Sequence, residues 1–344
     1  MSATLRSITR KFLTKYQAQM PALENAAVQA KQLVAEILSV HALDVHAVTS
    51  RCKKLESLSM KIRHKHYRNP SRQVTDKVGV RIITYYERDV DPIASVLTTQ
   101  LEIDPHRSEN TRLRLGLKEF GYRSIHLIAR TKNGWAKAPR YAALQGMWFE
   151  IQIRSILEHA WAEIEHEIVY KSGIQYPDSI KRRFARIAGT FELLEREFAS
   201  LRKQRDVLID SYVKKFSHGK SAGRLDAAKL IALLECERPG LLGWRRAAAE
   251  QHPFPPRVEA TCVAALAAAG IKTVDSLRAL LKTPRFRGAE RRFSGIESKQ
   301  PTHLALSYIA VALENRAVLA DYFPEISSTP QMQTLFPDAL GRKR

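Results

Sequence analysis

The sequence predicts an α/β (α+β) fold, in which a first domain combines β-strands with helices and a smaller all-α domain follows. Between residues 78 and 153, segments with the alternation of β-strands are interspersed with a helical segment. After residue 217 the composition becomes rich in Ala and Leu, with helical periodicity. The 344 residues, 44% of them hydrophobic, suffice for two domains with cores of their own.

The N-terminal region, up to about residue 68, reads as a series of helices because its apolar residues recur at helical spacing. The helical pattern stops at Asn69-Pro70-Ser71, since proline interrupts a helix. A helix is expected over Pro92–Gln100. Four strands are expected, over Val78–Tyr86, near Arg112–Leu117, over Ile125–Ala129 and over Trp148–Ile153.

The segment from Trp148 to Lys171 begins as a strand and continues as a helix. Within the strand, Glu150, Gln152 and Arg154 share one face, and the apolar residues between them share the other. The period becomes helical after Ser155. A polar strand face followed by a buried helix indicates a functional site, although an ordinary amphipathic edge strand has the same pattern. A second long helix is expected from about Ser179 to Lys215.

The segment Ser217–Gly223 has the composition of a linker. We therefore predict a first domain over residues 1–216, a linker over 217–224 and a helical domain over 225–344, for which we favour a regulatory role. Within that last domain, two short helices are expected around a turn at Gly270. Such a pair occurs in nucleic-acid-binding hairpins and, more commonly, in helical cores.

The charge and the cysteines limit the partners and the compartment. Lys and Arg number 56 against 35 acidic residues, a formal charge of +21, which indicates an anionic partner such as a nucleotide, a nucleic acid or a membrane surface. No apolar run approaches the roughly 20 residues of a membrane helix, so we expect no membrane segment. The three cysteines lie far apart without a CxxC motif, which favours the reducing cytoplasm.

The first cluster with chemical potential is basic. Arg51, Lys54, Leu58, Lys61 and Lys65 recur every three to four residues, so this spacing predicts one cationic helix face. Arginine suits bidentate contacts with phosphate, and lysine acts as a mobile point charge. A phosphate-binding face and a solvated basic helix are equally compatible with the pattern.

The second cluster is Asp76 to Arg81, which places a carboxylate directly before a hydrophobic strand. Such a carboxylate is a common Mg²⁺ ligand when a polyphosphate supplies further oxygen atoms. An aspartate in this place is equally common as a plain turn residue.

The third cluster runs from Lys118 to His126 and contains Gly121-Tyr122-Arg123. The Tyr122 ring offers a surface for base stacking, with cationic or hydrogen-bonding groups around it. A hairpin loop with a surface tyrosine is the alternative. The fourth cluster is the polar strand face, where Glu150 suits a general base or a metal ligand.

Taken together and in this order, the clusters make the chain resemble the synthetase domain of the RelA/SpoT family, especially the small alarmone synthetases. The resemblance covers roughly residues 30 to 200. It rests on Arg51-x-Lys53 with Ser57 and Lys61, Asp76-x-x-Gly79-x-Arg81, Lys118-x-x-Gly121-Tyr122-Arg123-Ser124-x-His126, Glu150-Ile151-Gln152-Ile153-Arg154, and Trp161-Ala162-x-x-Glu165-His166-x-x-x-Tyr170-Lys171.

The resemblance implies a mixed β-sheet flanked by helices and a pyrophosphokinase reaction, in which a guanosine 3′-hydroxyl attacks the β-phosphorus of ATP to form (p)ppGpp. The implied ATP-binding residues are Arg51, Lys53, Lys61 and Arg81. Asp76 and Glu150 are the implied catalytic residues and Mg²⁺ ligands. The implied acceptor-binding residues are Lys118, Tyr122, Arg123, His126, Gln152 and Arg154.

Two features leave the acceptor open. Phe120 stands where many members of the family have Asn, and a second aromatic residue changes how the acceptor base is recognised, so an adenine nucleotide is an alternative to GDP or GTP. The charge of +21 also fits tRNA, the acceptor of toxic small synthetases. A non-catalytic nucleotide- or RNA-binding protein on the same scaffold is a third alternative. The sequence shows no counterpart of the family's hydrolase half, so we expect synthesis without hydrolysis. A homo-oligomer is also compatible with the sequence.

Overall fold

The computed structural model describes residues 3–41, 43, 45–111, 124–132, 135, 138–170, 177–220, 223–237, 258–284 and 286–287. The chain divides into two compact units, Met1–Ala199 and Ser200–Arg344. The division falls within the continuous helix α8 (Asp178–Ser217) and so precedes the expected linker. A domain boundary at residue 216 stays a prediction.

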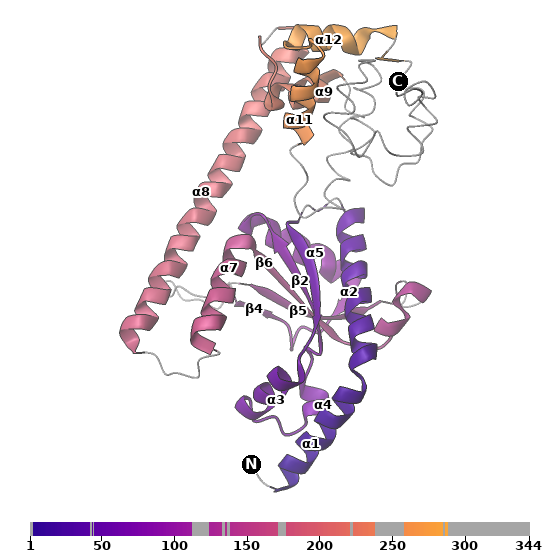
Figure 1. Cartoon of the computed structure of the whole chain (residues 1–344), viewed down its shortest axis with the longest axis vertical. Coiled ribbons are helices and arrows are strands. Elements are labelled where there is room, and N and C mark those ends of the chain that lie inside the picture. The colour runs from indigo at the N-terminus through magenta and orange to yellow at the C-terminus, as the bar shows by residue number, and fades with distance from the viewer. Residues whose placement is uncertain are drawn as a thin grey trace, which may run out of the picture. The chain divides into compact units, whose positions relative to one another are not determined.

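The first unit is built on a six-stranded mixed sheet (Figure 1). Its strand order is β1-β2-β6-β5-β3, and β4 pairs with β5. Strands β2 and β6 pair in parallel, and the other pairs are antiparallel. The mixed sheet that the family resemblance implies is therefore confirmed. The strands are β1 (Ala47–Cys52), β2 (Val78–Thr84), β3 (Leu101–Ile103), β4 (Glu109–Asn110), β5 (Ile125–Thr131) and β6 (Phe149–Ser155).

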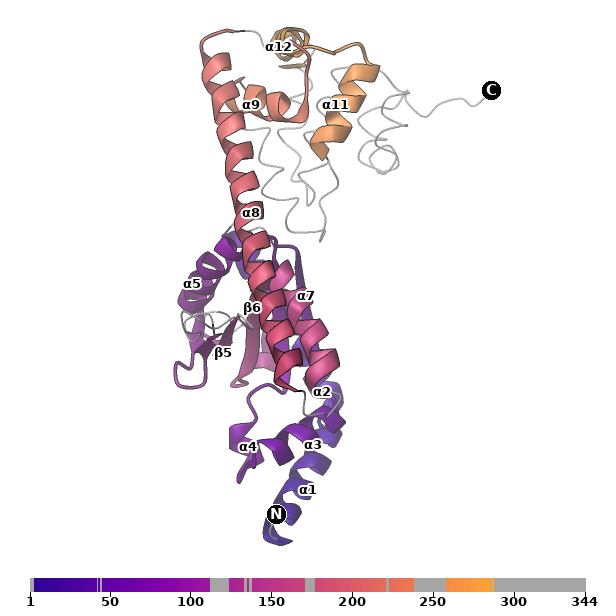
Figure 2. The same cartoon turned by 90° about the vertical axis from the view of Figure 1, so that its left-hand side faces the viewer.

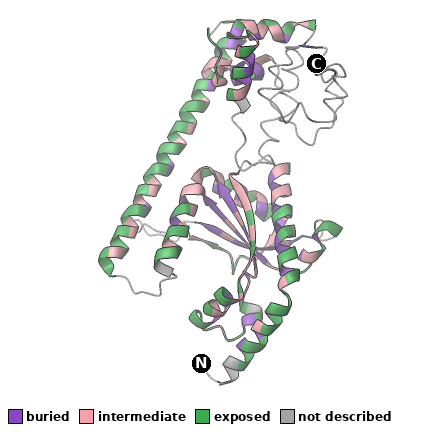
Figure 3. Ribbon diagram, in the orientation of Figure 1, coloured by how far each residue is buried: buried purple, intermediate pink, exposed green. Residues whose placement is uncertain are grey.

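One face of this sheet forms the core of the unit. Alternate residues of the central strands, such as Val80, Leu127 and Ile151, are buried there because successive strand residues point to opposite faces. Helices α2 (Met20–Val40) and α5 (Val90–Gln100) contribute to the same apolar core. Figure 3 shows buried strands and helices whose outer surfaces are exposed. The core thus leaves the other sheet face available to polar residues.

Helices α1 (Ala3–Ala18), α3 (Leu55–His64) and α4 (Pro70–Gln73) gather at one end of the unit (Figure 2). Two short 3-10 helices lie in connections of this unit. Helix η1 (Glu87–Asp89) lies between β2 and α5, and η3 (Pro139–Leu144) lies between β5 and β6. Helix α5 and strands β2, β5 and β6 confirm four of the expected elements. The strand expected near Arg112–Leu117 lies outside the described residues.

The expectation of helices throughout residues 1 to 68 is wrong at β1. Residues Ala47–Cys52 pair antiparallel with β2, and Arg51 lies opposite Gly79. Arg51 therefore belongs to a strand, whereas Lys61 belongs to α3, and no single helix face joins them. The three-to-four spacing of cations resembled a helix, but pairing with a distant strand decided the local structure.

The switch from strand to helix expected at Ser155 is confirmed. Its side chain accepts a hydrogen bond from the Glu158 backbone N–H (3.0 Å), and the Glu158 carboxylate accepts one from the Ser155 N–H (2.8 Å). This capping box satisfies donors that the first turn of α7 (Ile156–Glu165) would leave unpaired. A π-helix, η4 (His166–Tyr170), follows.

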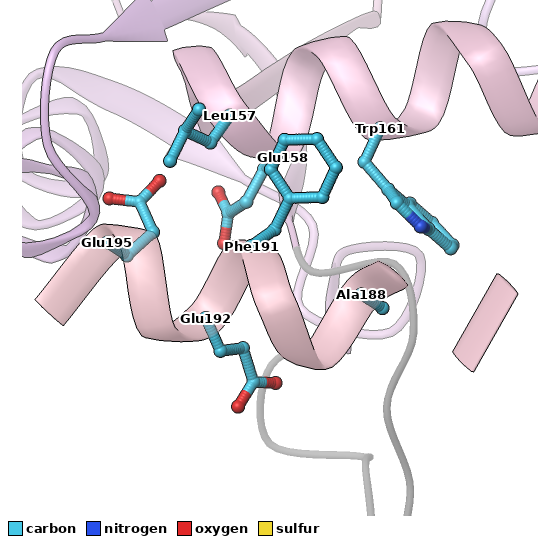
Figure 4. A pocket seen from close by; sticks show the side chains of 7 residues that line it. All are labelled: Leu157, Glu158, Trp161, Ala188, Phe191, Glu192 and Glu195. Carbon is cyan, nitrogen blue, oxygen red and sulfur yellow. The ribbon is translucent and has the colours of Figure 1, made fainter. Parts of the chain in front are cut away.

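A hydrogen bond from Ser155 to a residue of α8 fixes the start of α7. The Ser155 hydroxyl hydrogen-bonds to Glu195, whose other carboxylate oxygen accepts the backbone N–H of Glu87 (3.2 Å). Trp161 and Phe191 line a small cavity of about 20 Å³ between the two helices (Figure 4). Residues far apart in the sequence thus hold the end of β6 in place.

In the second unit, every element of the described residues is helical apart from one isolated bridge, in agreement with an all-α domain. The helices α9 (Ala227–Glu237), α11 (Val258–Ala268) and α12 (Val274–Lys282) share an apolar core that includes Leu233, Leu266 and Leu277. The expected turn is present at Gly270, whose φ of 86° favours glycine. Within the described ranges, no helix is both long and apolar enough to cross a membrane.

Candidate active site

The site lies on the sheet face opposite α2 and α5. Register places Arg51, Gly79 and Glu150 side by side across β1, β2 and β6. The next row up the strands contains Arg81, Gln152 and His126 together with Thr49. Residues in register share a sheet face, so these polar groups converge although they come from four strands.

Asp76 sits between two lysines at the entrance to β2. Its Oδ2 atom accepts hydrogen bonds from the ammonium groups of Lys53 and Lys61, the latter at 2.6 Å. Burial raises the pKa of Asp76, but the charges and hydrogen bonds of the two lysines outweigh this effect, and the net shift is downward. Asp76 is therefore ionised, and both lysines that the resemblance assigns to ATP converge on it.

Glu150 is held by neutral or weakly basic groups. Its Oε1 atom lies 2.9 Å from Nδ1 of His126, and its Oε2 atom accepts a hydrogen bond from the Gln152 amide (2.9 Å). Burial, the largest influence, raises the pKa of Glu150, and the nearby charge of Asp76 also raises it. The contacts with His126 and Gln152 outweigh both, so the pKa is lowered and Glu150 is a carboxylate at neutral pH.

The pair of carboxylates fits a hard divalent cation. The Oδ1 atom of Asp76 is buried and has no hydrogen-bond partner among the described residues. A buried carboxylate oxygen without a donor is a suitable ligand for Mg²⁺, which takes one or two protein carboxylates and completes its shell with phosphate oxygens and water. Asp76 and Glu150 therefore fit the Mg²⁺ site that the resemblance implies, and their role as ligands stays a prediction.

A second ionic cluster involves Arg81, which is in register with Gln152, and Arg154, which lies two residues further along β6. The carboxylate of Glu163, on α7, contacts Arg81 at 2.9 Å and Arg154 at 3.1 Å. His159 lies 3.7 Å from the same carboxylate, and burial followed by the charge of Arg154 lowers the pKa of His159 to about 4. His159 is therefore neutral at pH 7, and the two arginines share the charge of Glu163.

No motif in the sequence pointed to Tyr16, a residue of α1 that supports the lysine cluster. Its hydroxyl donates a 2.5 Å hydrogen bond to the Lys53 carbonyl oxygen and lies 3.4 Å from the Cys52 sulfur. Only 1% of Tyr16 is exposed. Helical periodicity marks Tyr16 as a core residue, but no local signal reveals that its hydroxyl fixes the backbone of a residue 37 positions later.

The structure brings together most of the residues singled out in the sequence. The described members on or beside one sheet face are Arg51, Lys53, Lys61, Asp76, Arg81, His126, Glu150, Gln152 and Arg154. The expected acceptor residues Lys118, Tyr122 and Arg123, as well as Phe120, lie outside the described residues. The sequence missed Glu163 as the shared partner of Arg81 and Arg154.

Comparison with known proteins gives the arrangement a family. Residues 50–175 match the model described as the region found in RelA / SpoT proteins. The GTP pyrophosphokinase YjbM of Bacillus subtilis (strain 168) is 26% identical over 161 residues, which cover 46% of this chain and 72% of that protein. The GTP pyrophosphokinase YwaC of the same organism is 26% identical over 168 residues, covering 46% and 73%.

Among solved structures, the crystal structure of the small alarmone synthetase 1 from Bacillus subtilis matches with a TM-score of 0.46 and 22% identity, over 56% of this chain and 97% of that one. The matched region of the family model runs from β1 to just beyond η4 and so contains Lys53, Asp76 and Glu150. The chain therefore contains a domain of the RelA/SpoT family.

Proposed function

We propose that the chain is an ATP:nucleotide 3′-pyrophosphotransferase that makes (p)ppGpp from GDP or GTP. The observation that carries the proposal is the pair of ionised carboxylates on one sheet face. Asp76 is placed between two lysines, and Glu150 is oriented by His126 and Gln152. The family match and the two relatives named as GTP pyrophosphokinases support it.

In the proposed reaction the acceptor 3′-oxygen attacks the β-phosphorus of ATP. The bond between the β-phosphorus and the α,β-bridging oxygen breaks, and AMP leaves. Glu150 accepts the proton of the 3′-hydroxyl, and His126 and Gln152 keep the carboxylate in one orientation. Because such transfer depends on positioning and charge neutralisation, the depressed pKa of Glu150 is compatible with its role.

Lys53, Lys61 and Arg51 would bind the ATP phosphates. On ATP binding, the two ammonium groups would exchange the Asp76 carboxylate for phosphate oxygens, and the Asp76 carboxylate would then be available to hold Mg²⁺. Asp76, with Glu150, would hold Mg²⁺, which supplies neutralisation of the phosphate charge when bound. Arg81 would contribute after release from Glu163.

In the decisive experiment, the full chain is incubated with Mg²⁺ and ATP labelled at the γ-phosphate, and transfer of label to one acceptor at a time is measured. The acceptors are GDP, GTP, AMP, ADP, ATP and bulk tRNA. We expect label on GDP and GTP, and no transfer without Mg²⁺. Label on an adenine nucleotide or on tRNA alone would replace the guanine assignment by one of those acceptors. Absence of label from every acceptor would refute the proposal.

Three finer predictions accompany the proposal. The reaction takes place in the cytoplasm, consistent with three cysteines that are free thiols. Regulation is assigned to the helical region after residue 217. A homo-oligomer stays a prediction, which sedimentation of the full chain at several concentrations measures directly.

A further inference from the structure

A pocket of about 600 Å³ opens at the end of the sheet where β2 and β6 begin. Its walls come from the junction of α1 and α2, from residues 71–77 and from the loop before β6. Its lining residues with charge or an aromatic ring are Lys77, Arg107 and Trp148. The pocket plays no part in the roles assigned above.

Lys77 is the unusual member of this lining. Its ammonium lies 5.6 Å from the centroid of the Phe12 ring, and no carboxylate forms an ion pair with it among the described residues. Lys77 is half-buried, so an anionic group in the pocket would compensate the charge of its ammonium. By contrast, Arg107 has its own carboxylate, since Asp104 lies at 2.6 Å.

The pocket adjoins the catalytic groups directly. Lys77 and Thr75 flank Asp76 in the chain, and the Lys53 backbone N–H donates to the Lys77 carbonyl (3.0 Å). Gly79 and Glu150 are in register, and Lys77 and Trp148 precede them by two residues each. Two strand residues span roughly 7 Å. A phosphate group in the pocket would therefore lie about one nucleotide phosphate chain away from the reacting atoms.

We propose that this pocket binds a terminal phosphate group of one of the two nucleotide substrates, with Lys77 as its cation. The inference rests on the proposed function for the identity of the nucleotides. An anionic phosphate supplies the charge that Lys77 lacks, and the 600 Å³ space admits a phosphate chain with its water shell. The donor and the acceptor both carry such a group.

The test compares the full-length wild-type protein with Lys77→Gln, Lys77→Arg and the control Lys31→Gln, which removes an exposed lysine of α2. Inorganic pyrophosphate is titrated calorimetrically into each protein. We expect about tenfold weaker binding for Lys77→Gln, a value typical of one charge-assisted contact, and unchanged binding for the two other variants. Equal affinities in all four proteins would overturn the inference. Urea midpoints check that the variants fold.

Kinetics with the same proteins identify the source of the phosphate. A rise of about tenfold in the KM of ATP for Lys77→Gln assigns the pocket to the donor. A loss of kcat/KM with GDP and GTP but not with GMP assigns it to the acceptor. If the wild type transfers no pyrophosphate yet binds it through Lys77, the proposed function fails and the pocket stands.

Discussion

Asp76 is a buried carboxylate and Glu150 a half-buried one, and the same sheet face stabilises them in different ways. Asp76 is held by two ammonium groups at the ends of long, flexible side chains. Glu150 is held by two groups of the sheet itself. The imidazole of His126 comes from the neighbouring strand β5, and the amide of Gln152 comes from β6, two residues after Glu150. Mobile cations can transfer to an incoming phosphate, whereas groups fixed by strand register cannot.

In the proposed mechanism, this difference would let one site accept a metal–nucleotide complex and still keep a preorganised base. On this proposal Asp76 would exchange its lysine partners when substrate arrives, so its environment would be part of binding. Glu150 would keep its partners, so its orientation would be set before substrate arrives. The comparison predicts that changes around Glu150 affect kcat, and changes around Asp76 affect KM and the requirement for metal.

The largest effect is expected from Glu150→Gln. The amide keeps the size of the side chain but cannot accept the hydroxyl proton, so kcat should fall by about 10²–10⁴-fold. The KM of ATP should change little because the lysine cluster is intact. Steady-state transfer of labelled pyrophosphate measures both constants. Unchanged turnover would show that Glu150 is not the base.

Asp76→Asn should act mainly through the metal. The substitution removes one negative charge and leaves the ammonium groups of Lys53 and Lys61 without their shared carboxylate. We expect the Mg²⁺ concentration for half-maximal activity to rise by about 10–100-fold, as on the loss of a metal-supporting group. A magnesium titration at saturating ATP gives this value. An unaltered magnesium requirement would remove Asp76 from the list of ligands.

His126→Ala tests the cause of the depressed pKa of Glu150. Without the imidazole, burial and the charge of Asp76 prevail, and the pKa of Glu150 should rise. Since the base must be ionised, the acid limb of kcat/KM against pH should move to higher pH. His106→Ala, in an exposed turn, serves as the control. An acid limb at the same pH in both variants would contradict the role of His126.

The smallest effect is expected from Tyr16→Phe, which removes one hydroxyl and keeps the ring. The loss of the hydrogen bond to the Lys53 carbonyl should lower the free energy of unfolding by about 0.5–1.5 kcal/mol. The KM of ATP should rise while kcat is retained, because Lys53 belongs to the mobile cluster. Urea unfolding and ATP titration measure the two quantities. A fall in kcat alone would place Tyr16 with Glu150 instead.

Local pattern was sufficient for much of the fold and of the site. Glu150, Gln152 and Arg154 were placed on one strand face because alternation fixes the side of each residue. The helix start at Ser155 followed from the change of period, and the capping box confirms it. The hydrophobic strand pattern after Asp76 also predicted that this residue stands just before a strand, and β2 does begin two residues later.

Other features depended on residues that are distant in the sequence. The cations from Arg51 to Lys65 had helical spacing, yet Arg51 lies in β1 because β2 offers an antiparallel partner. Local spacing could not reveal this pairing, because the free energy of a strand comes largely from its neighbours. Glu163 likewise became the partner of Arg81 only through the approach of α7 to β2.

The sequence by itself determined which residue types stand at each strand and helix position, because side-chain periodicity is a local property of the backbone. It therefore defined the two carboxylates, the lysines and the residue order that is typical of the RelA/SpoT family. Only the tertiary structure decided their partners: two lysines converge on Asp76, His126 and Gln152 fix Glu150, and Tyr16 holds Lys53. Hydrogen bonds and ion pairs between distant residues form only when packing brings both groups together.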